Sequence, residues 1–299
     1  MGVQPLAPFS DGWADLPVAV ERIDASSLSD MITVQPTFSV ATLVTDPAQY
    51  NEMLASFLAA GFSAETTEFL AIDNTGAHQL DAYRGLTAAL NRARGRYSVL
   101  CHQDVRLTHD TRRDLLARLE TLTEHDPAWA LAGNAGGVGS GKLAMRITDP
   151  HGADQALGSF PAQAQSLDEN FIVVRGGTRF GFSQDLSGFH LYGADLCLQA
   201  EMAGHSAYVI DFHLTHLSAG NADQTFRQSE RAFRQKWTRA LAPRWLQTTC
   251  TLVRIGALPV SRDALRSLAP ARVHVALKRR LGPLLGRVER GSRGADHGL

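Results

Sequence analysis

Four short apolar runs, each separated from the next by a segment with helical spacing, constrain the chain most strongly. The runs cover residues 38–44, 68–72, 97–101 and 128–132. Apolar residues three and four positions apart predict helices over about 47–60, 80–93 and 110–122. Strands that alternate with helices form a largely parallel sheet covered on both faces. The sequence therefore predicts an α/β fold with a mostly parallel, Rossmann-like sheet flanked by helices.

Polar residues follow three of these predicted strands. They are Thr45 with Asp46, Asp73 with Asn74, and His102 with Gln103 and Asp104. Ligands of such sheets bind beyond the carboxyl ends of the strands, so we expect these side chains to line one cleft. A carboxylate at a strand end suits Mg²⁺ or Mn²⁺, although Asp104 alone could equally cap a turn.

The second half of the chain is less regular. Residues 133–141 are rich in glycine and are expected to form a flexible loop, followed by an extended segment over 143–148. An apolar run at 171–174, a helix over 190–203, a strand over 208–212 and a helix with Phe226, Phe233, Trp237 and Leu241 on one face are also predicted.

Gly136 to Lys142 matches the glycine and lysine spacing of a phosphate-binding loop. Such a loop continues with Ser or Thr and then a helix, whereas Leu143 follows here in an extended segment. A P-loop phosphotransferase is therefore the weaker alternative.

Charge and cysteine content exclude several classes of protein. The 299 residues carry 29 basic and 30 acidic side chains. This balance excludes a protein that binds nucleic acid through its overall positive charge. Three cysteines (Cys101, Cys197 and Cys250) form no disulfide framework, and no signal peptide is evident. These features predict a cytoplasmic protein.

The C-terminal segment has a charge of its own. Residues 261–299 hold nine Arg or Lys and three acidic side chains, a net charge of +6. Residues 273–288 mix apolar and basic side chains, as helices at membrane surfaces do, but a solvated chain end has the same composition. Both a peripheral membrane contact and a solvated tail stay open.

Residues 38–105 resemble the front half of nucleotide-sugar glycosyltransferases of the GT-A fold, close to family 2. The likeness rests on 72–76, on 82–97 and on His102–Asp104, which stands where the family has its Asp-x-Asp metal motif. It is closest to a branch of glycosyltransferase-like proteins with His-Gln-Asp-Val at this place. It continues through 132–136, 166–169, 188–199 and 209–216, so it spans roughly 38–220.

The resemblance implies an inverting, metal-assisted hexosyltransferase. It would move a sugar from a nucleoside-diphosphate donor, expected to be a UDP-sugar, to a glycan, a lipid-linked sugar or another hydroxyl acceptor. The residues that it implies for the donor are Thr45, Asp46, Asp73, Asn74, Arg84, His102 and Gln103. Asp104 would hold Mn²⁺ or Mg²⁺, and His216 is either a second metal ligand or an ordinary polar residue at a strand end.

The catalytic base is left open by the sequence. Inverting transfer needs a carboxylate that accepts the proton of the attacking hydroxyl. The family's acidic pair is missing from the segment 192–196, where Asp195 is the nearest match or else a structural aspartate. Asp168, Glu169 and Asp185 are the alternatives.

The expected organisation has three parts. They are a leader over 1–36, a GT-A-like domain over 37–220 whose nucleotide half ends near 132, and a helical, basic extension over 221–299. Because the acidic pair is missing, a nucleotide-sugar binder without catalytic activity is a further alternative.

Overall fold

The computed structural model describes residues 35–220 and 224–256. The chain divides into two compact units, residues 1–233 and 234–299, so the boundary falls 13 residues beyond the expected end of the main domain, residue 220. The predicted leader and the basic segment 261–299 lie outside the described residues, apart from Gln35 and Pro36.

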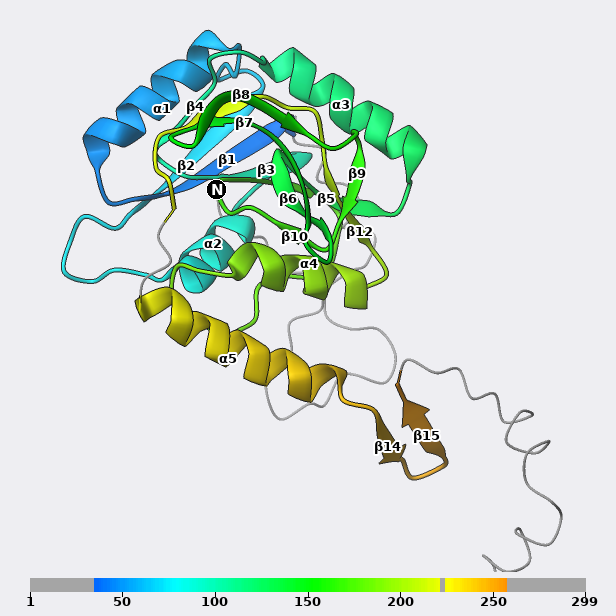
Figure 1. Ribbon diagram of the computed structural model, residues 1–299. Coiled ribbons are helices and arrows are strands. Elements are labelled where there is room, and N and C mark those ends of the chain that lie inside the picture. The colour runs from blue at the N-terminus through cyan, green and yellow to red at the C-terminus, as the bar shows by residue number, and fades with distance from the viewer. Residues whose placement is uncertain (1–34, 221–223, 257–299) are drawn as a thin grey trace, which may run out of the picture. The chain divides into compact units, whose positions relative to one another are not determined.

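The first unit is built on a seven-stranded sheet (Figure 1). In spatial order its strands are β2 (Thr67–Asp73), β1 (Phe38–Val44), β3 (Tyr97–Cys101), β11 (Phe171–Arg175), β5 (Trp129–Gly133), β12 (Ser206–Val209) and β9 (Ala162–Ala164). The pairs β1–β2, β1–β3 and β5–β12 are parallel, whereas β11 is antiparallel to both of its neighbours and β9 is antiparallel to β12. The predicted α/β class is confirmed, but the sheet is mixed because β11 separates β3 from β5.

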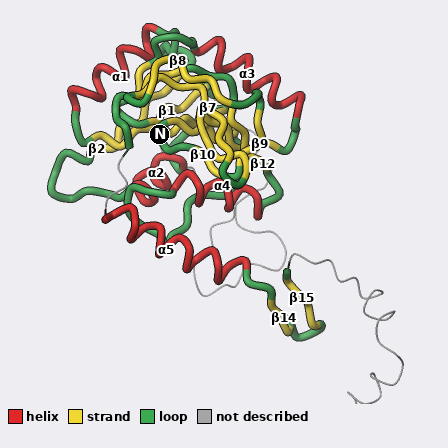
Figure 2. The backbone as a smooth tube through the Cα atoms, viewed as in Figure 1, coloured by secondary structure: helices red, strands yellow, loops and turns green. Residues whose placement is uncertain are grey.

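Helices cover both faces of this sheet (Figure 2). Helices α1 (Pro47–Ala59) and α3 (Arg112–His125) pack on one face, and α2 (Ala82–Leu90) and α4 (Tyr192–Met202) pack on the other. Asp46 caps α1 through the backbone N–H groups of Ala48 and Gln49, as the sequence Asp46-Pro47 predicts. Two hydrophobic cores therefore fix the carboxyl ends of β1 and β3 between the helical layers.

A second sheet extends from the first. Its order is β10 (Ser166–Leu167), β6 (Ala135–Gly139), β7 (Lys142–Asp149), β13 (Leu214–His216) and β4 (Val105–Arg106), and β8 (Gly152–Leu157) pairs with β7. The prediction of a flexible loop over 133–141 is wrong, because β6 and β7 form a hairpin there. A Cβ atom at Gly136 would lie 2.2 Å from the carbonyl oxygen of Ser166, so the glycine permits close strand contact. Lys142 begins a strand rather than a helix, and the context of a phosphate-binding loop is absent there.

Helix α5 (Gln224–Leu241) confirms the predicted helix at this place, and it runs across the boundary between the two units. The described part of the second unit ends in a hairpin of β14 (Arg244–Gln247) and β15 (Leu252–Ile255). Within the described residues, every helix is too short or too polar to cross a bilayer.

Candidate functional site

A cavity of about 220 Å³ opens at the carboxyl ends of β1 and β3. Its lining comes from the two strand ends and the residues after them, from helices α1, α2 and α4, and from the loop that precedes α4. The residues are Leu43, Thr45, Gln49, Ala82, Leu86, Leu100, Cys101, His102, Gln103, Asp104, Phe189 and Tyr192. The cleft expected from the strand ends is thus present, with an apolar floor and a polar rim.

Gln103 hydrogen-bonds the segment after β3 to the segment after β1. Its Oε1 atom accepts hydrogen bonds from the backbone N–H groups of Thr45 and Asp46, at 2.9 and 3.0 Å. Its Nε2 atom donates to Oγ1 of Thr45 at 2.9 Å. Since all three bonds cross from β3 to β1, Gln103 fixes the shape of the cleft, and Thr45 is held at its edge.

His216 reaches Asp104 through strand pairing. In the antiparallel pair β4–β13 His216 stands opposite Val105, and the N–H group of Leu217 donates to the carbonyl oxygen of Asp104 at 3.1 Å. The Nε2 atom of His216 lies 3.4 Å from Oδ1 of Asp104. The pairing of β13 with β4 therefore places His216 beside Asp104, although the two residues are 112 positions apart in the sequence.

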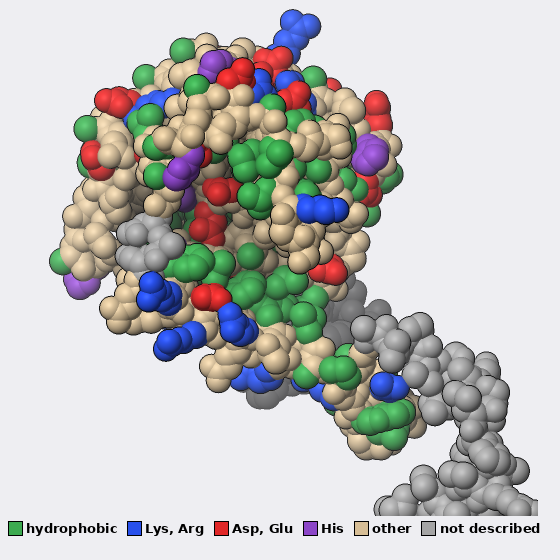
Figure 3. Space-filling view, viewed as in Figure 1, with side chains coloured by type: hydrophobic (Ala, Val, Ile, Leu, Met, Phe, Trp, Pro, Cys, Tyr) green, Lys and Arg blue, Asp and Glu red, His purple; other side chains and the backbone are tan. Residues whose placement is uncertain are grey.

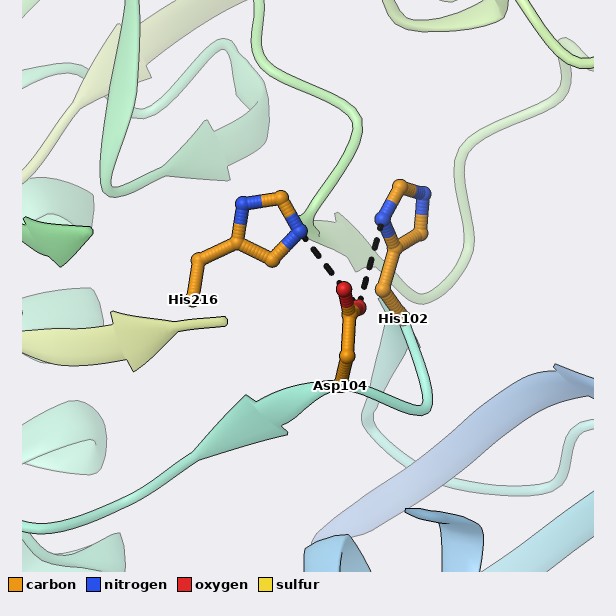
Figure 4. A group of neighbouring side chains, drawn as sticks. All are labelled: His102, Asp104 and His216. Atoms are coloured by element: carbon orange, nitrogen blue, oxygen red, sulfur yellow. Dashed lines mark ion pairs between the residues drawn. The ribbon is translucent and has the colours of Figure 1, made fainter. Parts of the chain in front are cut away.

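His102, Asp104 and His216 form one cluster (Figure 4). One ligand atom from each side chain lies within 4.8 Å of the others, and Nδ1 of His102 is 3.9 Å from Oδ1 of Asp104. Nitrogen and oxygen ligands about 2.1 Å from a cation lie about 3–4 Å from each other, so these separations suit one ion. Two imidazoles and a carboxylate favour Mn²⁺ or another first-row metal over Mg²⁺.

The other ring nitrogen of His102 contacts Tyr192. Nε2 of His102 lies 2.8 Å from the hydroxyl oxygen of Tyr192, and this hydroxyl lies 3.1 Å from the carbonyl oxygen of Glu169, to which it can donate. In the tautomer in which the hydroxyl donates to that carbonyl, its oxygen accepts a proton from Nε2, and Nδ1 of the neutral ring faces Asp104 with the lone pair that a cation binds. A hydrogen bond to the ring nitrogen that does not face the cation is the usual way in which metal-binding histidines are oriented.

The electrostatics of the cluster agree with a neutral histidine beside an ionised aspartate. Burial, and then the neighbouring His216, lower the pKa of His102, against the opposing effect of Asp104 and Asp168. Burial alone would raise the pKa of Asp104, but hydrogen bonds and charge from His216, with Ser218 and His102, hold it well below its ordinary value. Both groups are thus in the protonation state that binds a metal ion.

Four of the residues expected around the donor lie outside the lining of this cavity. Asp46 is the cap of α1, and Asp73 accepts hydrogen bonds from the backbone and hydroxyl of Thr75. Asn74 is buried. Its side-chain amide donates a hydrogen bond to the carbonyl oxygen of Leu80 and accepts one from the N–H group of Leu80. Arg84 is exposed and pairs with Asp81 at 3.7 Å. Asp73 still belongs to the same edge of the sheet, since it stands opposite Val44 in the β1–β2 register.

Asp195, the first choice for the base, is fully buried. Its two carboxylate oxygens accept hydrogen bonds from the backbone N–H and the hydroxyl of Ser183, at 2.8 and 2.6 Å. A base must reach the hydroxyl of a substrate. The geometry therefore favours the structural alternative for Asp195. Asp185 is exposed, and neither Asp185 nor Glu169 belongs to the cavity lining.

Glu169 lies at the amino end of α4. Leu191, the residue before this helix, adopts φ = 62° and offers no side-chain cap, and Oε1 of Glu169 accepts a hydrogen bond from the N–H group of Gly193 at 3.3 Å. Burial raises the pKa of Glu169 to about 8, against the backbone hydrogen bonds that favour its charged form. Asp168 beside it is exposed and accepts hydrogen bonds from Asn170.

The sequence reasoning missed Tyr192 and Phe189. Tyr192 is 3 % exposed, bonds His102 and lines the cavity, whereas Phe189 is 49 % exposed at its rim. Phe189 stands directly before the helix predicted over 190–203, and an exposed aromatic side chain there is a signal for a ligand contact. Tyr192 carries no such signal, because its partner is 90 positions away.

Comparisons with known proteins match the chain to a curated relative and to solved structures of much lower sequence identity. No family model matches the chain. Among solved structures, the mannosyltransferase PcManGT from Pyrobaculum calidifontis in complex with GDP-Man and Mn²⁺ is 13 % identical with a TM-score of 0.46, over 70 % of this chain and 65 % of that one. TarS of S. aureus is 14 % identical with a TM-score of 0.43, over 68 % of this chain and 40 % of that one. This chain thus spans less than two thirds of both.

The curated relative is the protein named ATP synthase subunits region ORF 6 of Fuscovulum blasticum. It is 38 % identical over 247 residues, which cover 81 % of this chain and 96 % of the relative. The name states a position beside other genes and no activity. At this identity and coverage, the chain belongs to the same family as ATP synthase subunits region ORF 6 of Fuscovulum blasticum.

Proposed function

We propose that the protein is a metal-assisted glycosyltransferase of the GT-A type, which transfers a sugar from a nucleoside-diphosphate donor to a hydroxyl acceptor. The observation that carries the proposal is the cluster at the end of β3, in which Nδ1 of His102 and Nε2 of His216 both face the carboxylate of Asp104. The position of this cluster is the one at which the sequence resembles the metal motif of family 2.

His102, Asp104 and His216 would hold the cation, and we propose Mn²⁺, which accepts imidazole ligands more readily than Mg²⁺ does. The bound cation supplies Lewis-acid stabilisation of the charge that develops on the diphosphate leaving group. Tyr192 orients His102 from behind, and Gln103 keeps Thr45 beside the cluster. These contacts hold the ligand atoms in place before the donor binds.

The nucleoside would occupy the cavity between β1 and α2. Leu43, Leu86 and Leu100 supply an apolar floor, and Thr45 and Gln103 supply polar groups at the rim. Predominantly apolar linings with a few fixed polar groups are typical of small-molecule sites. We take the nucleoside to be uridine, as the resemblance to family 2 suggests.

Glu169 is our choice for the catalytic base. Its carboxylate would accept the proton of the acceptor hydroxyl while the hydroxyl oxygen forms a bond to the anomeric carbon and the bond from that carbon to the diphosphate oxygen breaks. Attack from the side opposite the leaving group inverts the anomeric carbon. The raised pKa of Glu169 suits this role, because a base with a pKa near the working pH is an effective proton acceptor.

A non-catalytic nucleotide-sugar binder is the second candidate. It is favoured by the segment 192–196, which lacks the acidic pair of the family, and by the carboxylate of Asp195, which is hydrogen-bonded to Ser183. The two candidates share the donor site and differ only in turnover.

A thermal-shift screen of nucleotides and nucleotide-sugars, with and without Mn²⁺, tests the donor site. We expect a UDP-sugar to raise the melting temperature only when Mn²⁺ is present. Slow release of UDP from that donor then identifies an enzyme, and binding without release across a panel of sugar acceptors identifies a binder. A screen in which no nucleotide shifts the melting temperature contradicts the proposal.

A further inference from the structure

The described end of the second unit, residues 234–256, has an unusual surface. It carries Arg234, Lys236, Arg239, Arg244 and Arg254 and has no acidic side chain. It also exposes six large apolar side chains to between 42 and 57 %, namely Leu241, Trp245, Leu246, Leu252, Val253 and Ile255. Basic and hydrophobic side chains lie together in this region (Figure 3).

The apolar side chains occupy both faces of the hairpin. In the register of β14 and β15, Leu246 stands opposite Val253, and Trp245 stands opposite Arg254. Because side chains alternate along a strand, Leu246 and Val253 lie on one face and Trp245 lies on the other. A two-stranded hairpin with apolar residues on both faces is marginal in water, so an apolar environment is expected to surround it.

We propose that this hairpin inserts into the headgroup region of an anionic lipid bilayer, with the five neighbouring cations against the lipid phosphates. One protein surface would cover only one face of the hairpin, whereas a lipid interface surrounds both. Tryptophan and arginine are the side chains that favour this depth, because each has an apolar part and a polar end. Nucleic acid would satisfy the cations but leave Leu246, Leu252, Val253 and Ile255 in water.

The charge balance supports the same orientation. The five cations of residues 234–256 contrast with residues 1–233, which carry 15 basic and 27 acidic side chains and are repelled by an anionic surface. Each basic side chain near such a surface adds to the attraction. The hairpin end is therefore the described part of the chain that can approach anionic lipid.

Co-sedimentation of the full-length protein with lipid vesicles tests the inference. We expect binding to vesicles of phosphatidylcholine with phosphatidylglycerol, weaker binding at high salt, and no binding to phosphatidylcholine alone. The double variant Trp245→Ser, Leu252→Ser should bind about tenfold or more weakly, because both side chains lose their apolar burial. Leu58→Ser, a variant of an equally exposed leucine in α1, should bind as the wild type does.

Three results would overturn the inference. The first is a wild-type protein that stays in solution with both kinds of vesicle. The second is equal vesicle binding by the wild type and the hairpin variant, which would assign the contact to another segment, such as 257–299. The third is a dimer in sedimentation-velocity experiments that Trp245→Ser dissociates while vesicle binding is unchanged, which would make a second copy the occupant. Because no step uses the donor site, the outcome is independent of the proposed transferase activity.

Discussion

The Nε2 atom of His102 lies 2.8 Å from the hydroxyl oxygen of Tyr192, and this contact joins the end of β3 to the first residue of α4. It holds the ring of His102 so that Nδ1 faces Asp104. In the proposed metal site, Tyr192 therefore supports His102 without being one of the three ligands. The first prediction tests this role of Tyr192.

Tyr192→Phe should weaken Mn²⁺ binding by about 10- to 100-fold, the usual effect of removing a partner that orients a metal-binding histidine. The phenyl ring keeps the packing of a side chain that is 3 % exposed, so the fold should survive. Calorimetric titration with Mn²⁺ measures the change. Tyr208→Phe, which removes a hydroxyl bonded to Asp126 in another part of the sheet, is the control. Equal affinities for Tyr192→Phe and wild type would remove Tyr192 from the site.

Asp195→Ala should lower stability and leave the chemistry intact. Loss of the carboxylate leaves the buried N–H and hydroxyl of Ser183 without this partner, at a cost of about 1–3 kcal/mol.

Glu169→Gln should instead reduce the rate of transfer by at least about 100-fold and cause little loss of stability. Melting temperatures and turnover per folded molecule separate the two effects. A catalytically dead but fully stable Asp195→Ala protein would return the role of base to Asp195.

The pKa of Glu169 predicts two pH dependences. The rate should rise with pH toward about 8, because the carboxylate must be ionised to accept a proton. Stability should change in the opposite direction. The folded protein holds this proton to a higher pH than the unfolded chain, so Glu169 lowers stability progressively as the pH rises from its ordinary pKa toward about 8.

Glu169→Gln, which stays neutral, should therefore become more stable than the wild type across that pH range and match it in acid. Urea unfolding at several pH values measures the difference. A constant difference in the free energy of unfolding between the two proteins would show that burial does not raise this pKa.

Gly193→Ala should destabilise the first unit by about 1–3 kcal/mol or more, since overpacking at a rigid backbone contact forces the backbone to shift. The added Cβ would lie 2.3 Å from the carbonyl oxygen of Leu167 and 3.2 Å from Cγ of Glu169. Gly181→Ala is the matched control, because a Cβ there has no atom within 4 Å. Thermal unfolding compares the two variants, and equal melting temperatures would mean that the strand β10 moves aside freely.

The part of the site that lies on consecutive elements could be predicted from the sequence. Strand ends in a parallel register meet at one edge, so Thr45, Gln103 and Asp104 were expected to line one cleft, and they do. Asp46 and Asn74 were expected at the same place for the same reason. Their side chains are instead used by a helix cap and by a loop, because local backbone groups compete for short polar side chains.

The remaining site residues depend on pairings between distant segments. His216 reaches Asp104 only through the pairing of β13 with β4, and Tyr192 reaches His102 only because α4 packs against the sheet. The antiparallel strand β11 likewise pairs with both β3 and β5, and the periodicity of the sequence does not show which strands pair. The sequence could place His216 near Asp104 only through its resemblance to family 2.

The most direct test of the account is calorimetric titration of a UDP-sugar into the wild type, Asp104→Asn and Lys142→Ala, each with and without Mn²⁺. The account predicts Mn²⁺-dependent binding by the wild type and by Lys142→Ala, and a loss of at least about 100-fold for Asp104→Asn, whose amide cannot supply the anionic ligand. Binding by Asp104→Asn that equals the wild type, or a loss confined to Lys142→Ala, would contradict it.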